Sequence, residues 1–524
     1  MILRWIISRS FVFFMLIGGV SAQNSNFTAV RAVIDFNKPL RTWDGFGVNY
    51  VETSQTFNYD KKPQDYGGFG LLKESDKLKI TDLVFGNDGL KPSLVKMFLD
   101  PLHQHEPGGK YDHKTTTSNM MFFVQQGLKS TRARGEDLSI ITTLYGPPPF
   151  MTVQKVHRGR DLDPSKSGDL INYIVDWASY LVKDQKLPLK YISLHNEGES
   201  WLRWPEDGTT GASLDEGHDY NLFWDPEQVN STIKALRPAL DNSGLVDVGI
   251  TNGETTNWYR FSHWGFADAL YDDEEALDNL SLITSHGFYV GHISAVRWFG
   301  PHSSEGIDQL RSKKSKLHAW CTSTSWDIKD NSLIIDNEVH RRYIMNAQFV
   351  KEIHGNIYDA KVNGLIPWAL IQKSSDWIRP DPNPGSSFRV YDDGTWEIKK
   401  GYYYFKQVSR AGQAGMVVAD TWAMDSQIAL LAFEKAKTNQ SNAFVVVNLG
   451  YTDRFVDINI KGSNASSYQA YRTSGEEVYE YYETARVNNL SGENYQDIGN
   501  FNLKNEVLKY MAPANSVTTF FEIK

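Results

Sequence analysis

The chain is poor in cysteine, with Cys321 the only one among 524 residues. A single thiol excludes an internal disulfide and argues against a cysteine-rich zinc site. Positive charge is also in deficit, because 54 Lys and Arg face 63 Asp and Glu, giving a formal net charge of −9. This balance argues against a surface that binds a polyanion, so we expect no nucleic-acid partner.

Several functional motifs are missing as well. No Gly-x-Ser-x-Gly pattern, which marks the nucleophile turn of esterases, occurs in the sequence. The "GGFG" at residues 67–70 follows no clear strand, which argues against a phosphate-binding loop. The "HQH" at residues 103–105 has the spacing of metal ligands without an evident third ligand, so a solvated loop is favoured. We expect neither a cofactor nor a metal.

Long apolar runs are confined to the N-terminus. Arg4 and Arg9 precede the stretch "FVFFMLIGGV", and the small residues Ser21 and Ala22 follow it. This pattern is typical of a secretory signal peptide, and its apolar part of about ten residues is too short to span a bilayer. We expect residues 1–22 to be removed, no membrane insertion, and a secreted or periplasmic protein.

Short apolar runs recur along the chain and predict strands. Eight of them lie at residues 43–50, 94–99, 138–145, 191–194, 246–251, 280–286, 316–322 and 364–370. Amphipathic stretches such as "DLINYIVDWASYLVK" at residues 169–183 and "HRRYIMNAQFVKEIH" at residues 340–354 predict helices between them. Eight strands alternating with helices favour a (β/α)8 TIM barrel, which we place at residues 43–405.

The composition changes near residue 410. Strand-like runs such as "QIALLAFE", "NAFVVVNL" and "SVTTFFEIK" alternate there with turn residues, which predicts a β-sandwich side domain at residues 406–524. Near the start, "AVRAVIDF" is a further strand without a helical partner. We therefore predict that residues 23–42 join the sandwich.

Active sites of barrels form at the carboxyl ends of the strands. Polar residues follow the predicted strands at these points, and Glu197 in "YISLHNEG" stands out because an apolar run ends just before it. The alternative is that Glu197 has only a structural role, in which it caps a loop or pairs with Arg203. Residues that follow other strands include Tyr145, Glu254, His286, Tyr289, Ser323, Asp327 and Trp368.

Four motifs resemble glycoside hydrolase family 30, a family of the retaining barrel clan. "WDGFGVNY" resembles its first-strand signature, and "LYGPPPFMT" at residues 144–152 resembles its Ser-Pro-Pro-x-Trp-Met-Lys turn, with Phe150 in the Trp position. "LHNEG" resembles its Asn-Glu-Pro motif, with Gly198 in place of Pro. "GYYYFKQVSRAGQAG" and "MAPANSVTTFF" resemble the passage into the sandwich and its last strands. Family 39 is the nearest alternative.

The resemblance implies roles for individual residues. Glu197 is expected to be the general acid/base, which protonates the leaving oxygen of a glycoside. Asn196 is expected to bind the 2-hydroxyl of the sugar. Sugar contacts are expected from Tyr145, His286, Tyr289, Ser323 and Trp368.

The nucleophile of the family is missing. Its Trp-x-Thr-Glu pattern corresponds here to "WCTS", so that Ser323 stands where the Glu is expected. Three explanations stay open: Asp327 reaches the site from the loop, the enzyme inverts, or the protein binds glycans without cleaving them. Inversion requires a carboxyl gap of roughly 6.5–9.5 Å and a base, for which Asp327, Glu254 and Asp376 are candidates. Asp327 is the best second carboxylate.

We therefore predict a secreted hydrolase of β-glycosidic bonds, such as β-xylosides, in a plant or algal poly- or oligosaccharide. The alternative is a catalytically inactive glycan-binding protein on the same scaffold, because a fold does not determine an activity. The loop "HRGRD" at residues 157–161 is expected either to meet an acidic or sulfated sugar or, more readily, to be solvated surface. The sequence does not indicate an oligomeric state.

Overall fold

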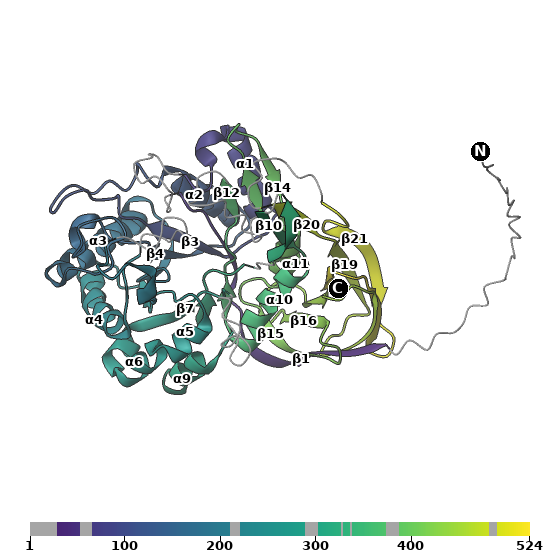
Figure 1. The fold of residues 1–524 in the computed structure, drawn as a ribbon. Helices are drawn as coiled ribbons and strands as arrows, with labels where there is room; N and C mark the ends of the chain where they lie inside the picture. The colour runs from purple at the N-terminus through teal and green to yellow at the C-terminus, as the bar shows by residue number, and fades with distance from the viewer. Residues whose placement is uncertain are drawn as a thin grey trace, which may run out of the picture.

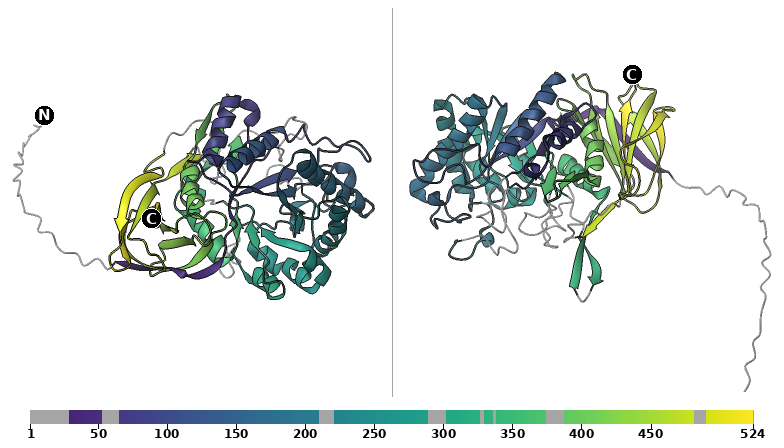
Figure 2. Two further views of the ribbon diagram at one scale, coloured as in Figure 1. Left: turned by 180° about the vertical axis from the view of Figure 1, so that it is seen from behind. Right: turned by 90° about the horizontal axis from the view of Figure 1, so that it is seen from above.

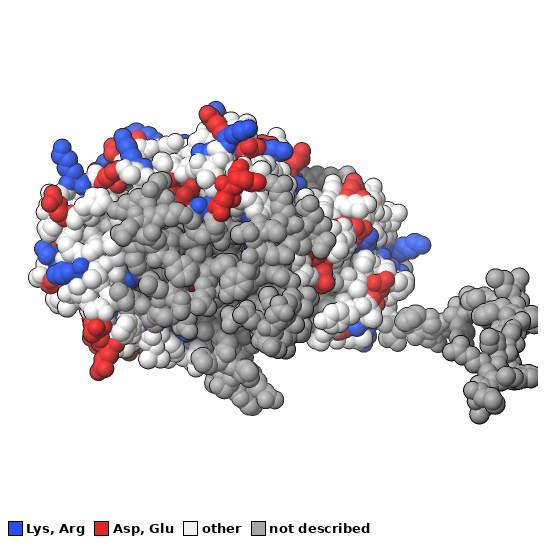
Figure 3. Space-filling model, turned by 45° about the horizontal axis from the view of Figure 1, so that its top comes forward, with Lys and Arg blue, Asp and Glu red and all other residues white. Residues whose placement is uncertain are grey.

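The chain folds into a barrel and an adjoining all-β domain, seen at the left and right of Figure 1. The computed structural model describes residues 29–52, 65–209, 221–288, 302–325, 329–335, 338–373, 387–480 and 490–523. Within this part of the chain, no helix has the length and apolarity needed to cross a membrane. Acidic and basic side chains are interspersed over the described surface of the face in Figure 3.

Eight parallel strands close the barrel, in the order β11-β2-β3-β4-β5-β6-β7-β8. They are β2 (Gly45–Asn49), β3 (Leu94–Leu99), β4 (Ser139–Leu144), β5 (Leu189–Ser193), β6 (Gly249–Thr251), β7 (Leu280–Ser285), β8 (Ala319–Cys321) and β11 (Gly364–Leu365). Each strand overlaps one of the eight predicted apolar runs. The predicted TIM barrel with a side domain is thereby confirmed, and the predicted β-sandwich of that domain corresponds to a single nine-stranded β-sheet.

Amphipathic helices cover the barrel. They are α1 (Glu74–Phe85), α2 (Ser118–Ala133), α3 (Ser167–Ser179), α4 (Pro226–Asn242), α5 (Trp258–His263), α6 (Phe266–Asp272), α7 (Glu274–Asn279), α9 (Glu305–Lys313), α10 (Gln348–His354) and α11 (Lys400–Ala411). In α3 the buried residues Leu170, Tyr173, Ile174 and Trp177 recur at helical spacing and form the face that packs inward. Helix α4 begins where the Asp225 carboxylate accepts from Gln228 N at 2.7 Å, a cap worth about 1 kcal/mol.

Short elements complete the connections. The 3-10 turns are η1 (Phe69–Leu71), η2 (Pro149–Met151), η3 (Pro164–Lys166) and η5 (Trp201–Arg203), and the π turns are η4 (Tyr180–Asp184) and η6 (Gly355–Asp359). A three-stranded sheet is formed by β12 (Ile371–Lys373), β13 (Phe388–Val390) and β14 (Trp396–Ile398).

The helix predicted at residues 340–354 is wrong in its first half. The chain there forms β10 (Glu338–Met345), which pairs with β9 (Lys329–Ile335) on one edge and β20 (Glu477–Glu480) on the other. Only α10 is helical. Strand pairing on both edges outweighs the helical pattern, since tertiary context overrides local propensity. The β9–β10 hairpin extends away from the body in the right-hand view of Figure 2.

The side domain is one nine-stranded sheet, in the order β21-β19-β23-β17-β16-β15-β1-β18-β22. Its strands are β1 (Val30–Thr42), β15 (Val417–Ala423), β16 (Ile428–Glu434), β17 (Ala443–Asn448), β18 (Arg454–Lys461), β19 (Ser467–Ser474), β21 (Gln496–Asn502), β22 (Val507–Ala512) and β23 (Ser516–Glu522). The purple strand β1 crosses this domain in Figures 1 and 2. Along β1, Val30, Ala32 and Ile34 are buried at alternate positions, as one face toward a core requires. The exact domain boundaries stay predictions.

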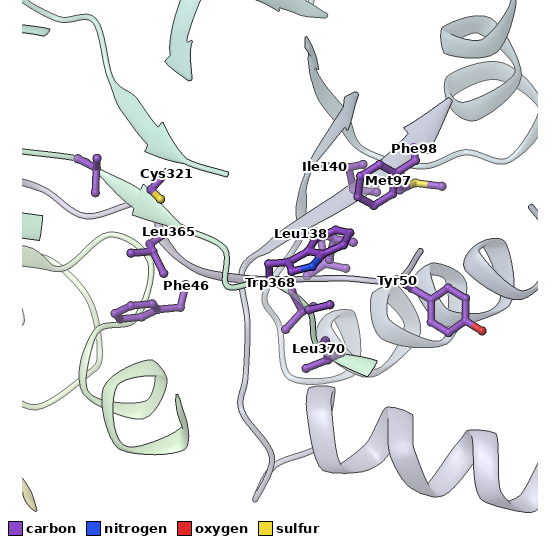
Figure 4. Packing of buried hydrophobic residues seen from close by; sticks show 14 of the residues in the cluster. Phe46, Tyr50, Met97, Phe98, Leu138, Ile140, Cys321, Leu365, Trp368 and Leu370 are labelled. Carbon is purple, nitrogen blue, oxygen red and sulfur yellow. The ribbon is translucent and has the colours of Figure 1, made fainter. Parts of the chain in front are cut away.

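Aromatic packing joins the two parts. The Trp43 ring lies 5.6 Å from that of Phe433 in β16, and the Phe46 ring lies 5.8 Å from that of Phe405 in α11. Phe46 pairs with Leu365 on the neighbouring strand β11, and Figure 4 shows the two side chains together in this core. One apolar core therefore runs from the barrel into the side domain.

Candidate active site

Glu197 lies just beyond the carboxyl end of β5, the fourth strand of the barrel. Its backbone is tied to the segment after β6, because Glu197 N donates to Glu254 O at 2.6 Å and Glu254 N donates to His195 O at 2.9 Å. Glu197 has a φ of 55°, a left-handed conformation that non-glycine residues rarely adopt. These hydrogen bonds hold the backbones of Glu197 and Glu254 side by side at the mouth of the barrel.

Both carboxylate oxygens of Glu197 contact nitrogen-bearing side chains. Oε1 lies 2.7 Å from Nδ1 of His286, and Oε2 accepts from Nη2 of Arg203 at 3.0 Å. Arg203 also donates to the Glu197 carbonyl and, at 2.8 Å, to Thr256 Oγ1. The ion pair with Arg203 is therefore present, as the purely structural interpretation of Glu197 predicts. It fixes the carboxylate at the mouth of the barrel and does not move it away from the predicted site.

His286 joins Glu197 to a second carboxylate. The imidazole follows β7, and its Nε2 lies 2.8 Å from Glu254 Oε2. Glu254 is fully buried, accepts from Thr143 Oγ1 at 2.8 Å, and forms an ion pair with the equally buried Lys96 of β3. A buried ion is tolerated when it is paired and hydrogen-bonded, and here both conditions are met.

The electrostatics follow from these contacts. Burial raises the pKa of Glu254, but Lys96 and His286 outweigh that effect and lower the pKa to about 2. Burial and Lys96 lower the pKa of His286, yet the carboxylates of Glu197 and Glu254 outweigh both and raise it above its ordinary value. The structure therefore favours an ionised Glu254 beside a His286 ring that binds a proton more readily than a free imidazole does.

Glu199 is a third buried carboxylate in the same loop. Its Oε1 accepts from Thr256 N at 2.9 Å and from Arg260 Nη1 at 2.7 Å. Burial raises the pKa of Glu199, while Arg203 and Arg260 outweigh it and lower the pKa. Thr256 Oγ1 accepts a hydrogen bond from Arg203 and donates one to Glu199. Glu199 and Thr256 therefore help to position the arginine that binds Glu197.

Two predicted aromatic residues pack on a common ring. Tyr145 lies edge-on to Phe98 with ring centres 5.0 Å apart, and Trp368 lies edge-on to the same ring at 6.3 Å. Trp368 also stacks with Tyr66 at 5.7 Å. Figure 4 shows Trp368 beside Phe98. Phe98 in β3 thus places Tyr145 and Trp368 in one aromatic cluster.

The remaining predicted residues differ in what the structure describes. Asn196 is buried and lies three residues beyond the end of β5, next to Glu197. Ser323 follows β8 and its carbonyl accepts from Gly287 N at 2.8 Å, which places it beside the His286 segment. Its buried hydroxyl has no hydrogen-bond partner among the described residues. Tyr289, Asp327 and Asp376 lie outside the described residues.

Two loops differ from their expected surface character. His103 of "HQH" is buried, its Nδ1 lies 2.9 Å from His113 Nδ1, and the described part of the chain holds no cluster of three His, Cys, Asp or Glu side chains fit for a metal. In "HRGRD", Arg158 and Arg160 are buried rather than solvated. The Arg160 guanidinium binds Asp161 and lies 3.4 Å from the centre of the Trp201 ring.

Sequence reasoning missed Lys96 and Glu199. Lys96 carried a usable signal, because it is the one charged residue in the apolar run "LVKMFL" and a buried charge requires a partner. Glu199 lies two residues after Glu197, but nothing in its local sequence separates it from an exposed loop carboxylate. Its role depends on Arg260, which lies on α5.

No family model and no curated protein matches the chain. By fold it is similar to the catalytic domain of GH30 xylanase C from Talaromyces cellulolyticus, with a TM-score of 0.64, 16% identity, and coverage of 94% of this chain and 100% of that one. It is also similar to the family 30 subfamily 8 xylanase Xyn30A from Clostridium acetobutylicum, with a TM-score of 0.63, 19% identity, and coverage of 94% of this chain and 98% of that one. For the endo-beta1,6-glucanase BT3312 the TM-score is 0.63 and the identity 16%, with coverage of 94% of each chain. The predicted likeness to glycoside hydrolase family 30 is thereby confirmed at the level of the fold.

Proposed function

We propose that the protein hydrolyses β-glycosidic bonds, with Glu197 as the general acid/base. The position of the Glu197 carboxylate carries the proposal: it follows the fourth strand of a closed barrel and is held on both oxygens by His286 and Arg203. Barrel enzymes place their catalytic groups at this end of the strands. Similarity of fold to proteins named as xylanases and a glucanase adds support.

The chemistry needs a second group besides this acid. In an inverting enzyme a carboxylate activates water, and in a retaining enzyme it attacks the sugar. Glu254 does not suit either role, because it is fully buried and its oxygens are bound by Lys96, Thr143 and His286. Asp327 is our proposed second carboxylate, and Asp376 is the alternative. Ser323, which stands in the expected nucleophile position, supports water as the attacking group.

The proposed substrates are β-linked xylans and glucans of plant or algal origin. The names of the structural neighbours, two xylanases and an endo-beta1,6-glucanase, support this choice. The aromatic cluster of Tyr66, Phe98, Tyr145 and Trp368 packs in the core beside the strand ends and is buried, so we expect it to support the sugar site from below rather than to stack on the sugar. The N-terminal pattern of Arg4, Arg9 and the following apolar stretch supports export, so the substrate is met outside the cytoplasm.

Release of reducing sugar from a panel of β-linked xylo- and gluco-oligosaccharides tests the proposal. We expect the Glu197→Gln variant to lose activity by about 10²- to 10⁴-fold, the usual contribution of a general acid/base. Glu136→Gln is the matched control, because Glu136 pairs with Arg134 at the exposed end of α2, on the outside of the barrel. The anomer first released then separates inversion from retention. Equal activity of wild type and Glu197→Gln would contradict the assigned role.

Ser323 also favours a second candidate function, glycan binding without cleavage. If the wild type binds the oligosaccharides in calorimetry and releases no sugar, while Ser323→Glu gains hydrolysis, the nucleophile has been lost and binding is the function. Hydrolysis by the wild type excludes this candidate.

A further inference from the structure

Four buried groups form a continuous series at the barrel mouth, Lys96–Glu254–His286–Glu197, which we call the proton array. They come from β3 and from the segments after β6, β7 and β5. Direct contacts join each member to the next: the Lys96–Glu254 ion pair, then 2.8 Å from Glu254 Oε2 to His286 Nε2, then 2.7 Å from His286 Nδ1 to Glu197 Oε1. The inference drawn from it rests on the proposed function, since it concerns how Glu197 holds its proton.

The two contacts of the imidazole determine where hydrogens lie. Each short N···O contact requires one hydrogen between its two atoms. Lys96 keeps Glu254 ionised, so Nε2 must carry the hydrogen that faces Glu254. The contact at Nδ1 then needs a second hydrogen, either on Nδ1 beside a Glu197 carboxylate or on Oε1 of a protonated Glu197 beside a neutral ring. Both forms contain one proton between His286 and Glu197.

We propose that His286 is a positioning residue that shares one proton with Glu197, and that Glu254, anchored by Lys96, fixes the ring so that Nδ1 faces the acid. When Glu197 gives this proton to the leaving oxygen, the carboxylate is left facing the bare lone pair of Nδ1. Repulsion between these two acceptors raises the proton affinity of Glu197. The second carboxylate takes the proton of the attacking water and releases it to solvent, while Glu197 takes up a proton from solvent, so the array returns to its starting state with protons balanced.

Other charged groups act on the array from neighbouring elements. Arg203 binds the second oxygen of Glu197 and opposes its protonation. His195 lies under Trp224 with ring centres 5.6 Å apart, and burial lowers its pKa to about 4, so it is neutral above that pH. Glu199 is neutralised by Arg260. Among the described residues, Glu254 is therefore the negative charge that favours protonation of the His286–Glu197 pair, whereas the positive charges of Arg203 and Lys96 oppose it.

The Glu254→Gln variant tests the array in the full chain. Loss of an adjacent opposite charge shifts a pKa by about one to three units, so we expect the pair to lose its proton that much lower on the pH scale. Ring ¹⁵N shifts of labelled histidine report the protonation of His286 directly, and the His286→Gln variant identifies its signals among the 13 histidines. The alkaline limb of kcat/KM should move to lower pH by the same amount.

Two further variants keep the test decisive. Glu352→Gln is the matched control, because Glu352 is a buried carboxylate paired with His302 at 3.2 Å outside the array, and it should leave His286 unchanged. Lys96→Met/Glu254→Gln removes both buried charges together, so it avoids an unpaired Lys96 if the single variant folds poorly. Its shift should have the same sign and be smaller, because the repulsion from Lys96 is lost too.

The outcomes separate the array from the proposed function. If the His286 ring shifts follow pH identically in wild type and in the Glu254 variants, the proposal is overturned. If the ring titration shifts while no substrate is hydrolysed, the array stands and the hydrolase proposal fails. Sugar release that depends on Glu197 with an unmoved His286 titration supports the hydrolase and rejects the array.

Discussion

His286 and His103 are both fully buried histidines near the carboxyl ends of barrel strands, and each has a carboxylate within reach. His286 lies within 2.8 Å of Glu197 and Glu254, and its pKa is raised. His103 lies 3.6 Å from Asp100 and 2.9 Å from the ring of His113, and burial lowers its pKa to about 4. The same residue type in the same kind of environment thus has a raised pKa in one place and a lowered pKa in the other.

The difference lies in the contacts and not in the burial. Both side chains lose the hydration that stabilises an imidazolium, so both start with a lowered pKa. Two direct carboxylate contacts favour the protonated ring of His286 and raise its pKa. At His103 a second histidine takes the place of one carboxylate, and Asp100 already accepts from Thr116 Oγ1 at 2.9 Å. A buried histidine therefore indicates acid–base chemistry only when ionised partners touch it.

The largest effect should come from breaking the ion pair beneath His286. Lys96→Met leaves the Glu254 charge buried without its partner, and such a change typically costs about 3–5 kcal/mol of folding free energy. Urea unfolding at pH 7 measures the loss. The Lys96→Met/Glu254→Gln variant should recover part of it, because no uncompensated charge remains. A loss below about 1 kcal/mol for Lys96→Met, as for an exposed pair, would remove the contrast between the two histidine clusters.

The next effect is the acid sensitivity of the His103 cluster. The folded pKa of His103, about 4, lies below the ordinary value of 6.5, so the unfolded chain binds the proton first as the pH falls. Because of this residue, the free energy of unfolding should therefore decrease by about 3 kcal/mol as the pH falls from 6.5 to 4, so the folded state becomes less stable. In His103→Gln the drop should shrink by that amount in urea unfolding across pH.

His105→Gln serves as its control. His105 is exposed and lies two residues from His103, so its variant should keep the wild-type slope of stability against pH. Equal slopes for all three proteins would show that burial does not lower the pKa of His103.

The smallest effect should come from Asp176, the outer carboxylate of the His103 cluster. Its side chain is 43% exposed and lies 2.7 Å from His113 Nε2. An ion pair at the surface contributes about 0–1 kcal/mol, so Asp176→Asn should lower stability by less than about 1 kcal/mol. A loss as large as that of Lys96→Met would mean that exposure does not separate the two clusters.

Most of the barrel was predictable because each strand is a short apolar run bounded by turn residues. "LVKMFL", for example, coincides with β3. The β9–β10 hairpin was not predictable, since its stability depends on pairing with β20 more than a hundred residues later. A local pattern of apolar residues contains no information about such a partner.

The site was predictable in part for the same physical reason. Glu197 and His286 follow strands, and strand ends in a barrel meet at one mouth, so their positions could be inferred together. The burial of Glu254 and its pairing with Lys96 depend on which side chains of the four neighbouring strands β3 to β6 point into the barrel. Neighbouring letters in the sequence do not fix that geometry.

The strand β1 places a constraint on the order in which the chain folds during synthesis. Val30–Thr42 pairs with β15 and β18, which lie beyond the entire barrel in the sequence. At about 5–20 residues per second, β1 waits on the order of 20–75 s after synthesis before its neighbours are made. Its apolar face of Val30, Ala32 and Ile34 has no partner strand during this interval. A chain that stops after the barrel would leave that face without a partner strand. The C-terminal strands therefore protect β1 from aggregation as well as completing the side domain.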